Sequence, residues 1–335
     1  MDNKTVSTSR LYNLDLLRAL AMVLVVLQHA WTMSEMDTDE WGWLCHGYRI
    51  LIGVGVPLFV VLSGALLLDA PVLSFREFYR RRMSRVLLPF LVWATIVYTF
   101  SFLTHKYEDV TTWQDFVLSY MPYLITNRIN DSHWFVHMIL ALYLMAPFMQ
   151  RALLQCSQRV VAGSLVAWFV VMVLRVVCPD VFGLRYVSSL FPFIGCFVAG
   201  YYLKHYAQQL PLRRNASVAL VLLTMVDIVT LGQYSVLPHC MAIALFGLFL
   251  TKPLLQCPKW GRLGLLVSSC SYMIYLVHIP LIRAILVFTG IAADVSQPWQ
   301  ALLQPVWLAA IALAVCCLMG LVIERLPRWA QRLLK

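Results

Sequence analysis

Long apolar runs follow one another along nearly the whole chain, from Leu14 to Ile323, and only short polar intervals separate them. A helix needs about 20 mostly apolar residues to cross a bilayer, so these runs predict about ten transmembrane helices. The predicted ranges are 14–31, 50–68, 86–104, 133–150, 160–178, 187–203, 215–231, 236–251, 265–288 and 301–323. We therefore expect an all-α, polytopic membrane helix bundle that forms a single domain over residues 1–335.

The composition agrees with lipid as the main solvent of the chain. Of the 335 residues, 61% are hydrophobic and only 13% are charged, which lies outside the range of soluble globular proteins. The first apolar run follows Lys4 and Arg10, as a signal peptide would, but no small-residue cleavage site follows it. We therefore expect this run to remain in the protein as its first membrane helix.

The positive charges are distributed unequally between the two sides of the predicted bundle. Of the 26 Lys and Arg residues, Arg18 falls inside the first predicted helix. Six fall on the side away from the chain ends, namely Arg49, Lys106, Arg128, Arg175, Arg185 and Arg283, and the other 19 fall on the side of the chain ends. Cytoplasmic loops are enriched in Lys and Arg, so we expect both termini in the cytoplasm. This topology accounts for most of the net charge of +10, and no nucleic-acid-binding pattern accompanies it.

Metal coordination is not indicated by the sequence. The nine cysteines are scattered and contain no C-x-x-C pair. His133 and His137 have the i, i+4 spacing of a zinc-binding helix, but Trp134 stands where that motif requires Glu. We therefore expect no metal site, and we interpret His137 as a packing residue.

Three ionisable side chains share one face of the first predicted helix. Arg18 and His29 are eleven residues apart, which places them on the same face and about 16 Å apart along the axis. Asp15 precedes Arg18 by one turn and can orient or neutralise it. Ionisable groups inside a membrane are costly and usually functional. The alternative is that Asp15 and Arg18 form an ion pair at the helix end while His29 is an interfacial residue.

Two further groups of polar residues occur at predicted helix ends and faces. Arg80, Arg81, Arg82 and Arg85 precede the third apolar run, where guanidinium groups can bind phosphates, although the positive-inside rule alone also predicts arginines here. In the ninth run, the spacing i, i+4, i+7 places three residues on one face about 10 Å long, while Tyr272 points about 100° away. The three residues are Ser271, Tyr275 and His278.

Five blocks of the sequence, in the same order, resemble the bacterial acyltransferase type 3 family. They are the R-x10-H spacing of Arg18 and His29, the apolar run 56–64 that ends in Ser63-Gly64, the basic segment 78–89, the triplet His133-Trp134-Phe135 and the segment 271–278. The segments between these blocks, including residues 160–251, carry no comparable signature. The resemblance therefore implies a type of reaction without identifying the acceptor.

What the resemblance implies is an O-acyltransferase of the bacterial cytoplasmic (inner) membrane. Members transfer an acyl group, usually acetyl from cytoplasmic acetyl-coenzyme A, to a hydroxyl of a cell-envelope polysaccharide or glycolipid. His29 and Arg18 would be catalytic, His29 as a general base or transient acyl carrier and Arg18 at the donor or the thioester carbonyl. The residues that would bind the donor are Arg80, Arg81, Arg82, Arg85, Ser63 and Gly64. The substrate channel would contain Asp15, His133, Trp134, Ser271, Tyr275 and His278.

Some family members carry a soluble hydrolase-like domain after the membrane part, and none is expected here, so the bundle would deliver the acyl group directly. Aromatic residues in and beside the outer loops 32–49 and 105–132 would frame a glycan entrance or form the interfacial belt. The expected partners are acyl-coenzyme A, an envelope glycan or lipid-linked saccharide, and membrane lipids. The main alternative is a transporter or lipid flippase, for which inverted repeats would be expected; the two halves show no such resemblance.

Overall fold

The chain folds into helices, and the part of it that the structure describes contains no strand. This computed structural model describes residues 3–34, 42–178, 190–207, 209–210, 236–251, 258–289 and 298–335, with positions 215, 218, 219 and 222. The helices are α1 (Asn3–Met33), α2 (Gly42–Gly53), α3 (Gly55–Leu67), α4 (Phe75–Leu103), α5 (Trp113–Ile125), the 3₁₀ turn η1 (Asp131–His133), α6 (Trp134–Gln155), α7 (Gln158–Val177), α8 (Phe191–His205), α10 (Leu237–Thr251), α11 (Pro258–Thr289), α12 (Pro298–Ile323) and α13 (Arg328–Leu334).

Seven helical stretches within the described residues are long and apolar enough to cross a membrane. They are Asn13–Met33, Gly47–Leu67, Phe75–Leu103, Trp134–Gln155, Gln158–Val177, Gly261–Thr289 and Leu303–Ile323. Each overlaps one of the predicted spans. The predicted all-α polytopic membrane bundle is therefore confirmed.

Four predicted spans have a different outcome. The range 50–68 was expected to be one helix, but the structure divides it near Val54 into α2 and α3. The ranges 187–203 and 236–251 correspond to α8 and α10, which have 15 residues each and so extend about 22 Å, less than the bilayer core. The range 215–231 lies almost entirely outside the described residues. The sequence predicted about ten spans, and the described part of the chain contains seven full-length helical stretches and two short helices.

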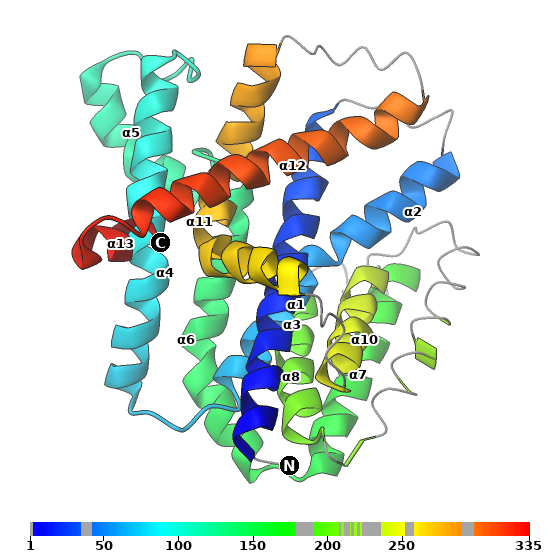
Figure 1. Ribbon diagram of the computed structural model, residues 1–335. Helices are drawn as coiled ribbons and strands as arrows, with labels where there is room; N and C mark the ends of the chain where they lie inside the picture. The colour runs from blue at the N-terminus through cyan, green and yellow to red at the C-terminus, as the bar shows by residue number, and fades with distance from the viewer. Residues whose placement is uncertain are drawn as a thin grey trace.

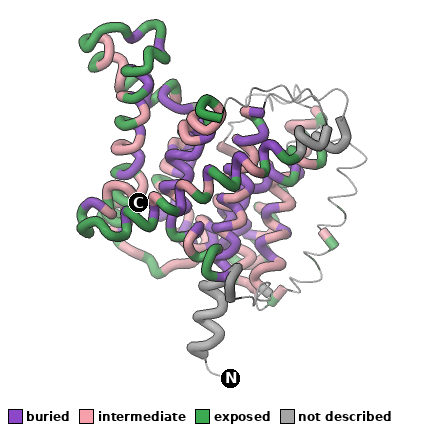
Figure 2. Tube along the Cα trace, turned by 45° about the horizontal axis from the view of Figure 1, so that its top comes forward, coloured by how far each residue is buried: buried purple, intermediate pink, exposed green. Residues whose placement is uncertain are grey.

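Helix α3 lies in the centre of the bundle and α7 at its edge (Figures 1 and 2). In the span that contains α3, 72% of the residues are buried, against 17% in α7. Helix α3 packs against α1, α8 and α10, and α1 also packs against α11 and α12. This arrangement brings the polar face of α1 and the middle of α11 together in the interior.

Glycines permit the closest contact in the bundle, between α3 and α8. A Cβ atom added to Gly64 would overlap the backbone of Phe197, and one added to Gly200 would overlap the carbonyl oxygen of Val61. Small residues let membrane helices approach each other in this way. Gly64, which the resemblance placed in donor binding, therefore serves the contact between helices.

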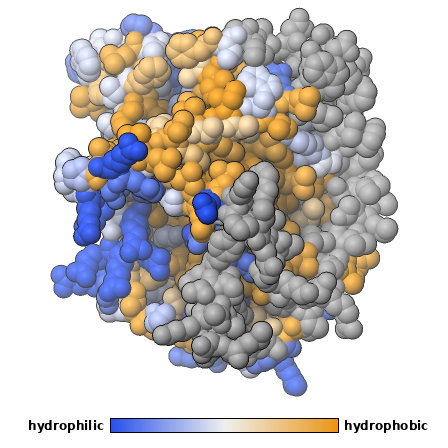
Figure 3. All heavy atoms as spheres, viewed as in Figure 1, coloured by the Kyte–Doolittle hydropathy of each residue, from blue (hydrophilic) through white to orange (hydrophobic). Residues whose placement is uncertain are grey.

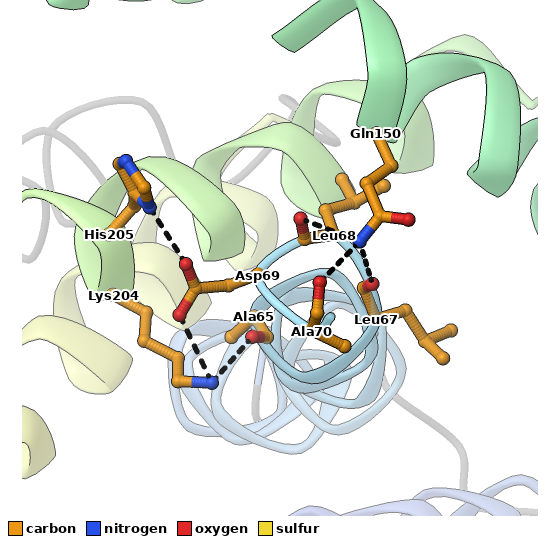
Figure 4. A network of polar contacts seen from close by, with 8 residues as sticks. All are labelled: Ala65, Leu67, Leu68, Asp69, Ala70, Gln150, Lys204 and His205. Carbon is orange, nitrogen blue, oxygen red and sulfur yellow. Dashed lines mark hydrogen bonds and ion pairs between the residues drawn. The ribbon is translucent and has the colours of Figure 1, made fainter. Parts of the chain in front are cut away.

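A network of polar contacts ties the end of α3 to α8 and α6 (Figure 4). Asp69 accepts hydrogen bonds from Lys204 at 3.3 Å and His205 at 2.8 Å, and Lys204 also donates to the carbonyl oxygen of Ala65 at 3.0 Å. Gln150 of α6 donates to carbonyl oxygens at the end of α3. These contacts satisfy helix-end carbonyls that have no partner within their own helix.

Helix α4 brings the basic segment to the same end of the bundle as the start of α1 and the turn between α6 and α7 (Figure 1). Ser74 caps α4 by accepting a hydrogen bond from the backbone N–H of Glu77. Hydrophilic side chains gather over the first part of α4 and around α13, whereas much of the rest of this face is hydrophobic (Figure 3). The charged end of the cavity described below lies within this hydrophilic region.

Candidate active site

A cavity of about 330 Å³ lies between α1, α3, α4, α6 and α11. Its polar lining comes from Arg18, Ser63, Arg82, Arg85, Tyr143, Ser271, Tyr272, Tyr275 and Lys335, and its apolar lining includes Met22, Phe59, Phe135 and Ile139. The cavity therefore combines a cationic end with apolar and aromatic walls. This volume falls within the range of small-molecule binding sites.

Arg18 is held at the cavity by two neighbouring polar residues. Its Nη1 lies 3.0 Å from Oδ1 of Asp15, one turn earlier on α1. The hydroxyl of Ser268 on α11 donates to the same carboxylate oxygen at 3.0 Å. Asp15 does not line the cavity itself, so it acts on the site through Arg18. The guanidinium keeps further N–H donors beyond the one that Asp15 accepts.

His29 meets His278 of α11 further along the same helix. The Nδ1 atom of His29 lies 3.1 Å from Nε2 of His278 and 2.9 Å from the carbonyl oxygen of Val25. The two rings are nearly perpendicular, with centroids 4.8 Å apart. His278 is fully buried, whereas His29 is half-buried. Sequence reasoning placed both histidines on functional faces, but it did not predict that they touch.

Tyr275 connects the cavity to the two histidines. It lines the cavity, and its ring lies 5.8 Å from that of His278 and 4.9 Å from that of Phe135. Its hydroxyl donates to the carbonyl oxygen of Ser132, which fixes α11 against η1. Tyr275 therefore contacts both the cavity and His278.

The neighbouring Tyr272 differs from its prediction. The helical spacing placed it away from the face of Ser271 and Tyr275, yet it also lines the cavity, and its hydroxyl donates to the carbonyl oxygen of Val86 at 2.7 Å. A long tyrosine side chain reaches around the helix, so an angle between Cβ directions is a poor guide to which side chains share a cavity.

Only part of the predicted basic cluster reaches the cavity. Arg82, which is half-buried, and Arg85, which is exposed, line it, whereas the exposed Arg80 and Arg81 do not. Arg81 forms an ion pair with Glu77 on its own helix. The helical period explains this division, because residues three positions apart share a face and the intervening ones point elsewhere.

Four residues of the predicted channel do not line the cavity: Asp15 and His278, described above, and Trp134 and His133. Trp134 is 40% exposed and packs against Phe193 of α8. His133 is buried against the edge of Phe90, and within the described part of the chain neither of its ring nitrogens has a hydrogen-bond partner. The structure brings together Arg18, Ser63, Arg82, Arg85, Ser271 and Tyr275 at the cavity, with Asp15, His29 and His278 beside it.

Three residues of the site were missed by the sequence reasoning. Tyr143 and Lys335 line the cavity, and Ser268 holds Asp15. Ser268 lies three residues before Ser271, so the polar face of the ninth run could have been extended by one turn. Nothing in the sequence points to Lys335, because its position depends on how α13 packs against α4.

The outer aromatic residues mostly pack against one another. Tyr98 and Tyr123 are buried, and Tyr107 contacts both of them. Trp31 stacks on Tyr48 at the far end of α1, whereas Trp113 is 65% exposed. The rings of Tyr107, Trp113, Tyr120 and Tyr123 thus pack with α4 and α5, while the side chains of Trp41 and Trp43 lie outside the described residues.

The comparison with known protein families agrees with this geometry. The chain matches the family described as "Acyltransferase domain" over residues 11–321. No curated protein and no solved structure gives a significant match. The matched range contains all five blocks and both histidines. The chain therefore belongs to the acyltransferase type 3 family, and it is a membrane-embedded acyltransferase.

Proposed function

We propose that the protein transfers an acyl group, most simply acetyl, from cytoplasmic acyl-coenzyme A to a hydroxyl of a cell-envelope polysaccharide or glycolipid. The observation that carries this proposal is the order of groups along α1 and α11. Arginines lie at one end of the cavity, aromatic residues follow, and the pair His29 and His278 lies beyond them. A coenzyme A thioester has a matching order of groups, with phosphates at one end and the reactive carbonyl at the other.

The arginines fit the phosphate end of the donor. Arg82 and Arg85 lie at the cavity on α4, and guanidinium groups bind phosphate oxygens with two donors at once. Arg18 is already paired with Asp15, which reduces its net charge and fixes its direction. Arg18 thus suits a polar group of the donor's flexible arm better than a phosphate dianion.

The histidine supplies the base that the reaction requires. A sugar hydroxyl is a weak nucleophile near neutral pH, so His29 would remove its proton as the oxygen attacks the thioester carbonyl carbon. The new C–O ester bond forms, the C–S bond breaks, and the proton passes from His29 to the departing thiolate. The products are the acylated acceptor and free coenzyme A, so no external oxidant or acid is consumed.

The membrane would be the cytoplasmic membrane of a bacterium, because acyl-coenzyme A is made in the cytoplasm. Both chain ends would lie in the cytoplasm, because most Lys and Arg residues fall on the side of the chain ends. The acceptor would approach from the opposite side, because His29 lies near the C-terminal end of α1, which ends at Met33. The exposed Trp113 provides one ring that can stack on the apolar face of a sugar. Membership of an acyltransferase family favours this function over a transporter or flippase.

The test is to incubate purified protein with acetyl-coenzyme A and a mixture of envelope glycolipids, and to measure free coenzyme A and the mass of the glycolipids. We expect coenzyme A release in equal amount to acetylated lipid. His29→Ala should abolish both products, whereas the control His137→Ala, whose ring packs against Phe90 and not in the pair of His29 and His278, should retain them. Transfer that persists in His29→Ala would exclude His29 as the base.

A further inference from the structure

We propose that His278 is a positioning residue, which fixes His29 as the Nδ1–H tautomer and so leaves the lone pair of His29 Nε2 free to act as the base. The catalytic consequence rests on the proposed function. The tautomer itself follows from the contacts of the two rings and can be measured without any substrate.

The state of His278 is set by the backbone of its own helix. Its Nδ1 lies 2.7 Å from the carbonyl oxygen of Tyr275 and 3.1 Å from that of Ile274. Carbonyl oxygens accept hydrogen bonds and cannot donate them, so the proton must reside on Nδ1. In the neutral ring, the other nitrogen, Nε2, then carries a lone pair and accepts.

The state of His29 follows from this assignment. Its Nδ1 lies between two acceptors, the carbonyl oxygen of Val25 at 2.9 Å and Nε2 of His278 at 3.1 Å. A proton on His29 Nδ1 can be shared by both. The opposite tautomer would direct the His29 lone pair at the Val25 oxygen and at the lone pair of His278 Nε2, and both contacts would be repulsive.

The two rings thus form a chain of hydrogen bonds with one direction, from His29 through His278 to the carbonyl oxygen of Tyr275. In many hydrolases a carboxylate receives the Nδ1–H of the catalytic histidine and fixes its tautomer. The described residues place no carboxylate against His29. A buried neutral imidazole fills this role here, and it does so without placing a negative charge inside the bundle, where it would be costly.

The first experiment is ¹⁵N NMR of the full-length protein labelled at histidine, in nanodiscs at a pH where His29 is neutral. His29→Gln identifies the His29 signals by their loss. We expect a protonated Nδ1 and an unprotonated Nε2 for His29 in the unaltered protein. In His278→Gln, the side-chain oxygen can accept from His29 Nδ1, so the tautomer should persist. His278→Leu leaves the Val25 carbonyl oxygen as the remaining one of the two acceptors, so it should lower the fraction of His29 that carries its proton on Nδ1.

A wild-type His29 that carries its proton on Nε2 would overturn the proposal, as would a tautomer that His278→Leu leaves unchanged. If His278→Leu does not fold, the wild-type and His278→Gln spectra still decide the tautomer. Failure of the proposed function would appear separately, as a correct tautomer in a protein that transfers no acyl group.

The second experiment is the kinetics of the same variants. His278 does not line the cavity, so we expect the KM for acyl-coenzyme A in His278→Leu and His278→Gln to stay within about twofold of the wild-type value. We expect kcat to fall on the order of 10²-fold or more in His278→Leu, by analogy with the loss of a tautomer-fixing partner elsewhere, and to recover at least tenfold in His278→Gln. Equal kcat in the two variants, or a change confined to KM, would contradict a positioning role.

Discussion

At the scale of single residues, Arg18 is the group whose chemistry the structure restricts most. Asp15, itself held by a hydrogen bond from Ser268, accepts from Nη1 of the guanidinium, and Arg18 also lines the cavity. Its geometry therefore matters as much as its charge. A lysine would keep the charge but lose the planar fork that can bind Asp15 and a ligand at the same time.

We predict that Arg18→Ala lowers kcat/KM for acyl transfer at least 10²-fold, which corresponds to the loss of about 3 kcal/mol of charge-assisted hydrogen bonding. The kcat/KM of Arg18→Lys should lie between the values for Arg18→Ala and the wild type. Initial rates over a range of acyl-coenzyme A concentrations measure both. Full activity in Arg18→Lys would show that charge alone is needed.

The four arginines at the start of α4 provide an internal control for donor binding. Replacing Arg82 and Arg85 by Ala should raise the KM for acyl-coenzyme A about tenfold or more, because both line the cavity. Replacing the exposed Arg80 and Arg81 by Ala should change the KM less than about twofold. Equal effects of the two double variants would indicate a general electrostatic attraction in place of a defined phosphate site.

At the scale of the elements, the contact between α3 and α8 determines where the cavity residues of α3 lie. Ser63 faces the cavity on one side of α3 while its neighbour Gly64 faces α8. The contact between the helices therefore places Ser63. A wider separation of α3 from α8 would move Ser63 relative to Arg18.

We expect Gly64→Ala to destabilise the protein by about 1–3 kcal/mol or more, because the added Cβ must displace the backbone of α8. The control is Gly163→Ala on α7, where an added Cβ meets nothing within 4 Å. That change should stabilise the helix by roughly 0.5–1 kcal/mol. Thermal unfolding in detergent compares the two variants, and a Gly64→Ala protein as stable as Gly163→Ala would refute the close contact.

The segment between α4 and α6 contains an acid-sensitive cluster. Asp109 accepts a hydrogen bond from Tyr123 and pairs with Arg128 at 3.2 Å, and Arg128 lies over the ring of Tyr123. The hydrogen bond from Tyr123, aided by Arg128, lowers the pKa of Asp109 in the folded protein. A carboxylate with a lowered folded pKa adds stability above its unfolded pKa of about 3.9, and that stability is lost as the pH falls through the folded value.

We therefore predict that hydrogen exchange in residues 105–132 stays constant from about pH 8 to pH 5, after correction for the intrinsic rate, and that protection decreases below about pH 4. Asp109→Asn should weaken the pH dependence of this segment, and Asp115, whose pKa is lowered by its hydrogen bonds from Thr112, should retain the rest. Protection that decreases equally at low pH in wild type and Asp109→Asn would assign the effect to other carboxyl groups.

At the scale of the whole molecule, the sequence predicted the class of fold because the bilayer imposes a length and a polarity on every span. It also predicted the face that carries Arg18 and His29, since a single helix fixes that face. It could not predict that His278 touches His29 or that Tyr272 lines the cavity. Those contacts depend on how α11 is rotated and packed against α1 and α4, which involves pairs of residues far apart in the sequence.

The same reason explains the errors at the element scale. The division of 50–68 near Val54 leaves the hydropathy of the segment unchanged, so the apolar pattern continues through it. Helix α5 was read as loop because its 13 residues, from Trp113 to Ile125, are too short to predict a span. Its capping box, in which Thr112 and Asp115 bond each other's backbone N–H groups, was a signal of a helix start that could have been used.

The central claim is that this one chain binds acyl-coenzyme A at its arginine-lined end and transfers the acyl group at His29. The most direct measurement uses proteoliposomes that contain the purified protein alone, with acetyl-coenzyme A added on the side of the chain ends and a lipid-linked glycan as acceptor. We predict acetylated glycan with the wild-type protein, none with His29→Ala, and none when the donor is confined to the opposite side. Strict dependence on an added soluble acyltransferase, or equal product from donor on either side, would contradict the account.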